Sequence, residues 1–189
     1  MFNFYKMDLP EEERFRANIL DLGALVHELT TNCWNAGRRE VAPRLVKMGE
    51  DYLKKHDSKK IIGAFIEHSH KHWEEIRLKN EDFFISHAHV IFNQLPIDSE
   101  NINAFKMLFT AKDKNNKDIV ISGDRQAIWE IFESLVKISI KYVHKARGIK
   151  IVETETGPRQ AYIDKNKFKY IDVKKLVEIW KIELPTVSA

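Results

Sequence analysis

The stretch SGDRQAIWEIFESLVKISIKYVHKARG, residues 122–148, decides the fold of this chain. Its large apolar residues recur at steps of three and four, which places them on one side of an α-helix: Ile128, Ile131, Phe132, Leu135, Ile138 and Tyr142. Ser122 and Asp124 can each cap the start of this helix, and Gly148 fits just beyond its end. We therefore predict a long central helix that contacts at least two others.

Amphipathic patterns predict further helices before this stretch. The first begins near Asp8, ends near Gly37, and has apolar residues at alternating steps of four and three: Phe15, Ile19, Leu22, Val26, Leu29 and Cys33. This register lasts less than three heptads, so we interpret it as an intramolecular packing face, with a dimer seam as the alternative. The pattern also predicts helices over residues 45–55 and 58–79, one capped by Asp82, and one that opens at Asp98 or Ser99.

The pattern changes after Gly148. Apolar and polar residues alternate sufficiently over residues 149–156 to predict a strand. Gly157-Pro158 marks a turn, and residues 161–171 could hold the return strand. Asp172 then caps a final amphipathic helix that Pro185 stops. We therefore predict a mainly α fold, a bundle of five to seven helices with a small C-terminal β-hairpin followed by a helix. The predicted division is a helical domain, 1–148, and a hairpin-plus-helix appendage, 149–189, which can also belong to the same domain.

The composition limits the classes of protein to which this chain can belong. The chain has 189 residues, of which 43% are hydrophobic and 31% charged, so we expect a globular fold with a sizeable core. It contains neither a secretory signal nor an apolar run of the roughly 18–20 residues that span a membrane, and we expect no membrane span. Cys33 is the single cysteine, which excludes an internal disulfide and fits an intracellular, reducing compartment. The net charge of +3 does not identify a partner.

Histidines cluster between positions 68 and 89, where five of the eight lie. On a helix His68 and His72 are one turn apart, and with Glu75 they could hold a metal ion. The segment lacks the glutamate of an HExxH motif, and no other Cys or His cluster completes the site. We favour the interpretation that both histidines lie at the polar border of the apolar face of a packed helix. We expect no cofactor.

Lysines alternate with aromatic residues in the predicted return strand. Lys165, Lys167 and Lys169 would share one face of that strand, with Tyr162, Phe168 and Tyr170 among them. Such interleaving is typical of nucleic-acid surfaces, so a nucleic-acid-binding module is the alternative function. It is equally typical of the solvated face of an edge strand, where lysines discourage aggregation, and we favour that interpretation.

Familiar catalytic motifs are missing from the sequence. It contains no glycine-rich phosphate loop, no GxSxG elbow and no kinase or dinucleotide-binding signature. Cys33 lies on the apolar face of the first predicted helix, where a small buried thiol is common, and no neighbouring base is evident. We therefore expect a protein without enzymatic activity.

Two stretches resemble a known class of protein. FIEHSHKHWEEIRLKNEDFF (residues 65–84) and IVISGDRQAIWEIFESLVKISIKYV (residues 119–143) are similar to small helical proteins of nucleocytoplasmic large DNA viruses. The resemblance covers residues 65–143 and carries no catalytic motif. It implies a minor structural or assembly protein, with the virion as a possible location, that acts by binding other proteins.

The expected function is therefore that of a protein–protein interaction component. Tyr162, Tyr170 and Trp180 are the predicted partner-binding residues, because amphipathic aromatic side chains are enriched at interface hot spots. We expect self-association or a stable hetero-complex. A metal protein built on the histidines is a third, less favoured hypothesis.

Overall fold

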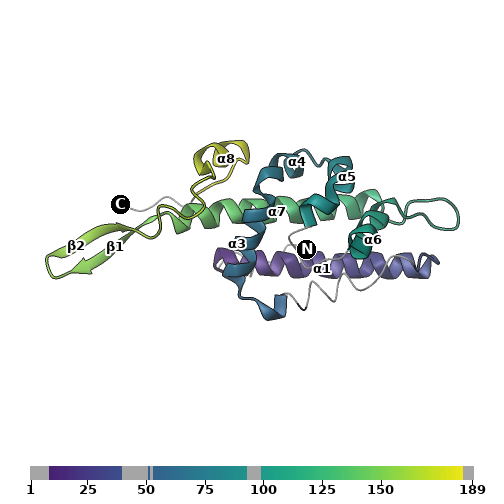
Figure 1. The fold of residues 1–189 in the computed structure, drawn as a ribbon, viewed down its shortest axis with the longest axis horizontal. Coiled ribbons are helices and arrows are strands. Elements are labelled where there is room, and N and C mark those ends of the chain that lie inside the picture. The colour runs from purple at the N-terminus through teal and green to yellow at the C-terminus, as the bar shows by residue number, and fades with distance from the viewer. Residues whose placement is uncertain (1–8, 40–50, 52, 93–98, 185–189) are drawn as a thin grey trace.

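Figure 1 shows the computed structural model of the chain, which describes residues 9–39, 51, 53–92 and 99–184. Within these ranges only the backbone is described for residues 88–92, 99–102, 104, 105, 149–154, 158–160 and 162. The helices are α1 (Glu11–Asn35), α3 (Ser58–Ser69), the 3₁₀ turn η2 (His70–His72), α4 (Trp73–Arg77), α5 (Glu81–Phe92), α6 (Ser99–Thr110), α7 (Ser122–Ala146) and α8 (Val173–Ile179). The strands are β1 (Ile149–Thr154) and β2 (Gly157–Tyr162). The described chain is mainly α, as predicted.

The two longest helices, α1 and α7, have 25 residues each and lie side by side in opposite directions (Figure 1). At one end Lys145 of α7 pairs with Glu11 of α1 at 3.0 Å. α7 confirms the predicted long helix, because it also contacts α4 and α8. The Asp124 carboxylate accepts a hydrogen bond from the backbone N of Ile121 at 3.1 Å, so it satisfies a free N–H group at the helix start.

The end of α7 explains why a glycine stands at position 148. The backbone N of Gly148 donates to the carbonyl of Lys145 at 3.0 Å. A Cβ atom at position 148 would lie only 3.0 Å from that same oxygen. A larger residue would therefore push the chain away from the helix end at the point where the hairpin begins.

The main hydrophobic cluster lies where α1, α3, α4, α7 and the C-terminal segment meet. Its buried members are Phe15, Leu53, Ile61, Ile62, Ile66, Trp73, Ile76, Leu135, Val136, Ile138, Ile140, Tyr142, Val143, Ile171, Trp180 and Ile182. The last three come from beyond Gly148, so α8 and its flanking residues share the core of the helical body.

A second cluster lies at the opposite end of the α1–α7 pair. It joins α1, α6, the loop after α6 and the start of α7 through Leu29, Cys33, Leu108, Phe109, Val120 and Ile128. Arg125 of α7 also forms an ion pair with Glu81 of α5 and donates to the carbonyl of Phe109. All six residues of the predicted packing face on α1 belong to or pack against one of the two clusters, so this face packs within the chain.

The predicted continuous helix over residues 58–79 is wrong, because it breaks at η2. Ser69 precedes the break, and its hydroxyl donates to the carbonyl of Phe65 at 2.6 Å while accepting from the indole N–H of Trp73 at 2.8 Å. A side chain that competes for a backbone carbonyl in this way favours a bend in the helix. The bend allows both Ile66 and Trp73 to be fully buried.

The start of α5 also differs from the prediction. Lys79 has a positive φ of 52°, which ends α4 in a left-handed turn. The side chain of Asn80 then accepts from the backbone N of Phe83 at 3.1 Å, so Asn80 caps α5. Asp82, the predicted cap, lies inside the helix.

Strands β1 and β2 form an antiparallel pair whose register runs from Ile149↔Tyr162 to Thr154↔Gly157. The pair extends beyond the helical body, whereas α8 folds back onto α7 (Figure 1). Asp172 caps α8, as predicted, by accepting from the backbone N of Lys175 at 3.1 Å. The prediction that the return strand reaches residue 171 is wrong, because β2 ends at Tyr162 and a turn follows.

Candidate interaction surface

Arg147 holds the segment after the hairpin against the end of α7. Its Nε atom donates to the carbonyl of Lys167 at 2.7 Å and its Nη1 atom to that of Ile171 at 3.0 Å. The remaining Nη2 atom donates to the carbonyl of Phe168. One guanidinium group therefore satisfies three carbonyls of a segment that has no regular secondary structure of its own.

The three predicted nucleic-acid lysines lie on this turn, and they do not share a strand face. The ammonium group of Lys167 donates to the hydroxyl of Tyr142 at 2.8 Å and lies 4.8 Å from the centre of that ring. Lys165 and Lys169 are exposed. The predicted row of lysines is therefore not formed, because the strand on which it depended ends at Tyr162.

The three aromatic residues predicted to bind a partner have different environments. Trp180 is only 5% exposed and belongs to the main cluster, so its prediction as an exposed contact residue is wrong. An amphipathic pattern marks the apolar side of a helix but not whether that side faces the core or a partner. Tyr170 is 53% exposed, and its ring lies 4.6 Å from that of His70. Tyr162 lies in β2, and its side chain is outside the described part of the structure.

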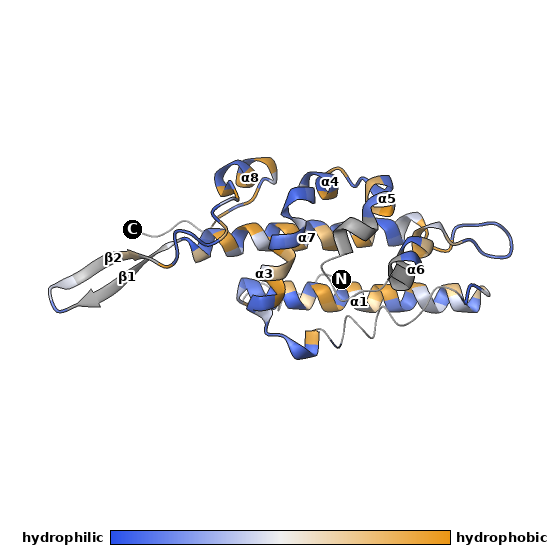
Figure 2. Cartoon of the chain, viewed as in Figure 1, coloured by the Kyte–Doolittle hydropathy of each residue, from blue (hydrophilic) through white to orange (hydrophobic). Residues whose placement is uncertain are grey.

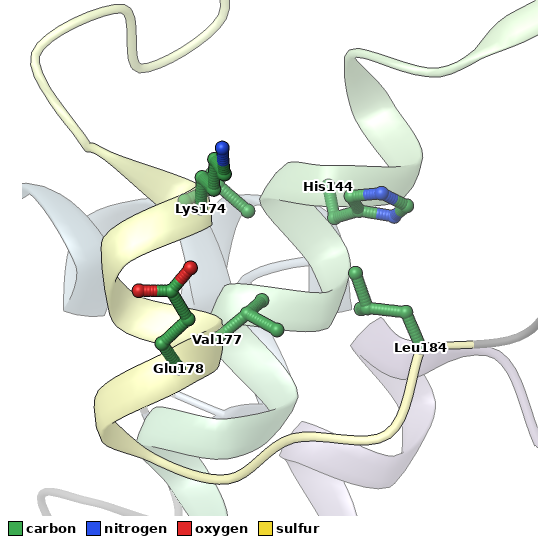
Figure 3. A pocket seen from close by; sticks show the side chains of 6 residues that line it. His144, Lys174, Val177, Glu178 and Leu184 are labelled. Carbon is green, nitrogen blue, oxygen red and sulfur yellow. The ribbon is translucent and has the colours of Figure 1, made fainter.

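A hollow of about 370 Å³ lies between the end of α7, α8 and the chain that follows α8. Val173, Val177 and Leu184 provide its apolar surface, and its polar rim consists of His144, Lys174 and Glu178. Figure 3 shows Val177 of α8 and Leu184 pointing into this space, with the imidazole of His144 beside them. The hollow is therefore mainly apolar, with His144, Lys174 and Glu178 at its edge.

Sequence reasoning missed this hollow. Lys174 and Glu178 are one helical turn apart, which is a common pair on any exposed helix face. His144 lies 30 residues earlier, and nothing in the spacing connects it with α8. The three meet only because α8 folds back across the end of α7.

The predicted metal ligands do not form a metal site. The Glu75 carboxylate accepts a hydrogen bond from the side-chain amide of Asn80 at 2.7 Å, and the His72 ring lies 5.3 Å from that of Phe83. Across the described residues, no group of three or more His, Cys, Asp or Glu side chains is arranged to hold a metal ion. His68 is half-buried on α3.

Cys33 is fully buried in the second cluster, beside Leu108 and Phe109. A nucleophilic thiol needs access to its substrate and an electropositive setting. The burial of Cys33 favours a packing role, as the sequence predicts.

The environment of His72 predicts that stability depends on pH. Burial lowers the pKa of His72 below its usual 6.5, and the neighbouring charges of His87 and Lys71 lower it further. The folded state therefore binds this proton less readily than the unfolded chain. The contribution of neutral His72 to the free energy of unfolding is present above pH 6.5. It is lost as the pH falls through the lower pKa that His72 has in the folded state.

We expect His72→Gln to reduce the loss of stability on acidification. Urea unfolding of the wild type and the variant at about pH 7.5 and about pH 5.5 measures this difference. His68→Gln removes an imidazole nearby and is the matched control. An equal pH dependence in wild type and His72→Gln would contradict the prediction.

Comparison with known proteins finds no matching family model, no matching curated protein and no matching solved structure. None of the described helices is both long enough and apolar enough to cross a membrane.

Proposed function

We propose that this protein is a protein–protein interaction component without enzymatic activity, which binds its partner at the C-terminal end of α7. The observation that carries the proposal is the hollow between α7 and α8, with its mainly apolar lining and three polar residues at its edge. Its volume of about 370 Å³ accommodates one or two large side chains of a partner. Interface hot spots have this character, with an apolar anchor in a pocket and polar groups around it.

The C-terminal segment carries further exposed apolar residues outside the hollow. Ile163, Tyr170 and Ile179 are all exposed, and they belong to the same C-terminal segment as the hollow. Exposed apolar side chains of this kind add area to a binding surface when a partner covers them. The β1–β2 hairpin extends from the same end of α7 and adds an arm that a partner could contact (Figure 1).

The proposed role of the protein is in the assembly of a larger protein complex. The resemblance of residues 65–143 to small helical proteins of large DNA viruses supports a minor structural or assembly role, in a virion or during its formation. Both a second copy of the chain and a different protein are compatible with the hollow. The proposed contact surface is the same in either case.

Site-specific photo-crosslinking tests this proposal. A photoreactive residue at position 174, on the rim of the hollow, should give one discrete adduct in an extract of the native source or with a second copy. We expect excess unlabelled protein to compete this adduct away, because the binding is specific. A photoreactive residue at position 130, exposed near the middle of α7, is the matched control. Equal adducts at both positions, or none at position 174, would refute the proposed surface.

A further inference from the structure

The end of the molecule opposite the hollow brings together basic segments that are far apart in sequence. The Nε atom of Arg38 donates to the carbonyl of Lys112 at 2.8 Å, across 74 residues of chain. This bond joins the end of α1 to the loop of residues 111–121 that connects α6 and α7. The loop is the hydrophilic extension beyond α6 in Figure 2.

Both segments are held in defined conformations. After α1, Gly37 adopts a positive φ of 84°, and the backbone N of Arg38 donates to the carbonyl of Cys33 at 2.8 Å. This is a Schellman turn, which fixes where the chain leaves the helix. In the loop, the Asp113 carboxylate accepts from the backbone N atoms of Asn115 and Lys117, at 2.8 and 2.9 Å. The cations are therefore carried on preorganised turns.

Positive charge predominates on these turns. The cations are Arg38, Arg39, Lys112, Lys114 and Lys117, and the anions are Asp113 and Asp118. Lys112 pairs with Asp118 at 3.3 Å, and the Asp113 carboxylate is directed at backbone amides of its own loop. Arg39, Lys114 and Lys117 are exposed, so they remain accessible to an anionic partner.

An exposed indole lies beside one of these cations. Trp34 is 48% exposed at the end of α1, and the guanidinium of Arg39 lies 5.3 Å from the centre of its ring. Indole rings and guanidinium planes both provide faces on which nucleic-acid bases stack. An acidic peptide would use mainly the cations, whereas a nucleic acid uses both the cations and the face of the indole.

We propose that this basic end, formed by Trp34, Arg38, Arg39, Lys112, Lys114 and Lys117, binds single-stranded nucleic acid. The cations neutralise phosphates, and an unpaired base stacks on the indole of Trp34. The bases of a duplex are already stacked, so a duplex cannot use this ring in the same way. The contacts involve phosphates and base faces, so single-stranded RNA and DNA both qualify. This site is distinct from the proposed protein-binding hollow and from the lysines at positions 165–169.

The fluorescence of the Trp34 indole provides a direct measurement of base stacking. Of the four tryptophans in the chain, Trp73, Trp129 and Trp180 are buried, and Trp34 is exposed. A base that stacks on Trp34 should quench its fluorescence. We expect oligouridine and oligothymidine of about 12 nucleotides to quench the full-length protein, and Trp34→Phe to abolish the quenching.

Fluorescence anisotropy with the same labelled oligonucleotides measures the role of the cations. We expect the double variant Lys114→Glu/Lys117→Glu to bind about tenfold more weakly. Its log–log salt dependence should be flatter by about 0.7 for each phosphate that the variant no longer neutralises. Lys165→Glu/Lys169→Glu, which also reverses two exposed lysines but at the opposite end, is the matched control and should bind as the wild type does.

Several outcomes would overturn the proposal. Binding without quenching of Trp34, or an equal loss of affinity in the control double variant, would show that the oligonucleotide binds elsewhere. A duplex that binds as tightly would show that the indole does not select unpaired bases. Polyglutamate that competes as well as oligouridine would identify the basic end as a surface for acidic proteins. Absence of binding at micromolar protein in about 50 mM salt would also refute the proposal.

Discussion

Replacement of Trp180 by alanine should lower the free energy of unfolding by about 3–5 kcal/mol, the usual range for a buried tryptophan. The side chain is 5% exposed, and it packs in the main cluster with residues of α1, α3 and α7. Truncation therefore removes apolar contacts and leaves a cavity at the junction of α8 with the helical body. Urea unfolding followed by circular dichroism measures the loss.

Tyr170→Ala is the matched control for this substitution. The ring of Tyr170 is 53% exposed and contacts that of His70, so its removal should cost less than about 1 kcal/mol. The two aromatic residues have the same predicted role from sequence, and their burial separates them. A loss below about 1 kcal/mol for Trp180→Ala would mean that α8 does not share the core.

Arg147→Met should destabilise the protein by about 2–3 kcal/mol, because hydrogen bonds from a charged donor are stronger than neutral ones. The guanidinium donates to the carbonyls of Lys167, Phe168 and Ile171, and methionine keeps much of the side-chain volume but none of these donors. We expect Arg147→Lys to restore little of the loss, since an ammonium group lacks the planar fork that reaches three acceptors.

Lys145→Met controls for loss of a positive charge two residues earlier. Lys145 is largely exposed and pairs with Glu11, so its loss should cost less than about 1 kcal/mol. Chemical denaturation of all three variants at neutral pH gives the comparison. If Arg147→Met and Lys145→Met cost the same, the segment after the hairpin does not depend on Arg147.

Much of the candidate surface could not be predicted from the sequence. The sequence contains every residue of the hollow, yet His144 and Glu178 are 34 positions apart and share no motif. The basic end is also assembled from distant segments, because Arg38 and Lys112 are 74 positions apart and are joined by a hydrogen bond. The predicted sites rested on spacing within one segment, and the structure assembles both surfaces from several segments.

The sequence by itself determined the two longest helices and their apolar faces. α7 spans Ser122–Ala146, within one or two residues of its prediction, and the predicted face of α1 is the one that packs. The Gly37 turn and the Asp172 cap were also readable. These features follow from periodicity and from hydrogen bonds within a few residues, which a local pattern records.

The tertiary structure alone decided what each apolar face covers. It broke the helix at η2, placed Trp180 in the core and turned the lysine segment at positions 165–169 into a loop held by Arg147. An amphipathic stripe has the same period whether it packs against the chain or against a partner. The burial of such a stripe depends on contacts between distant segments, and those contacts form only when the whole chain folds.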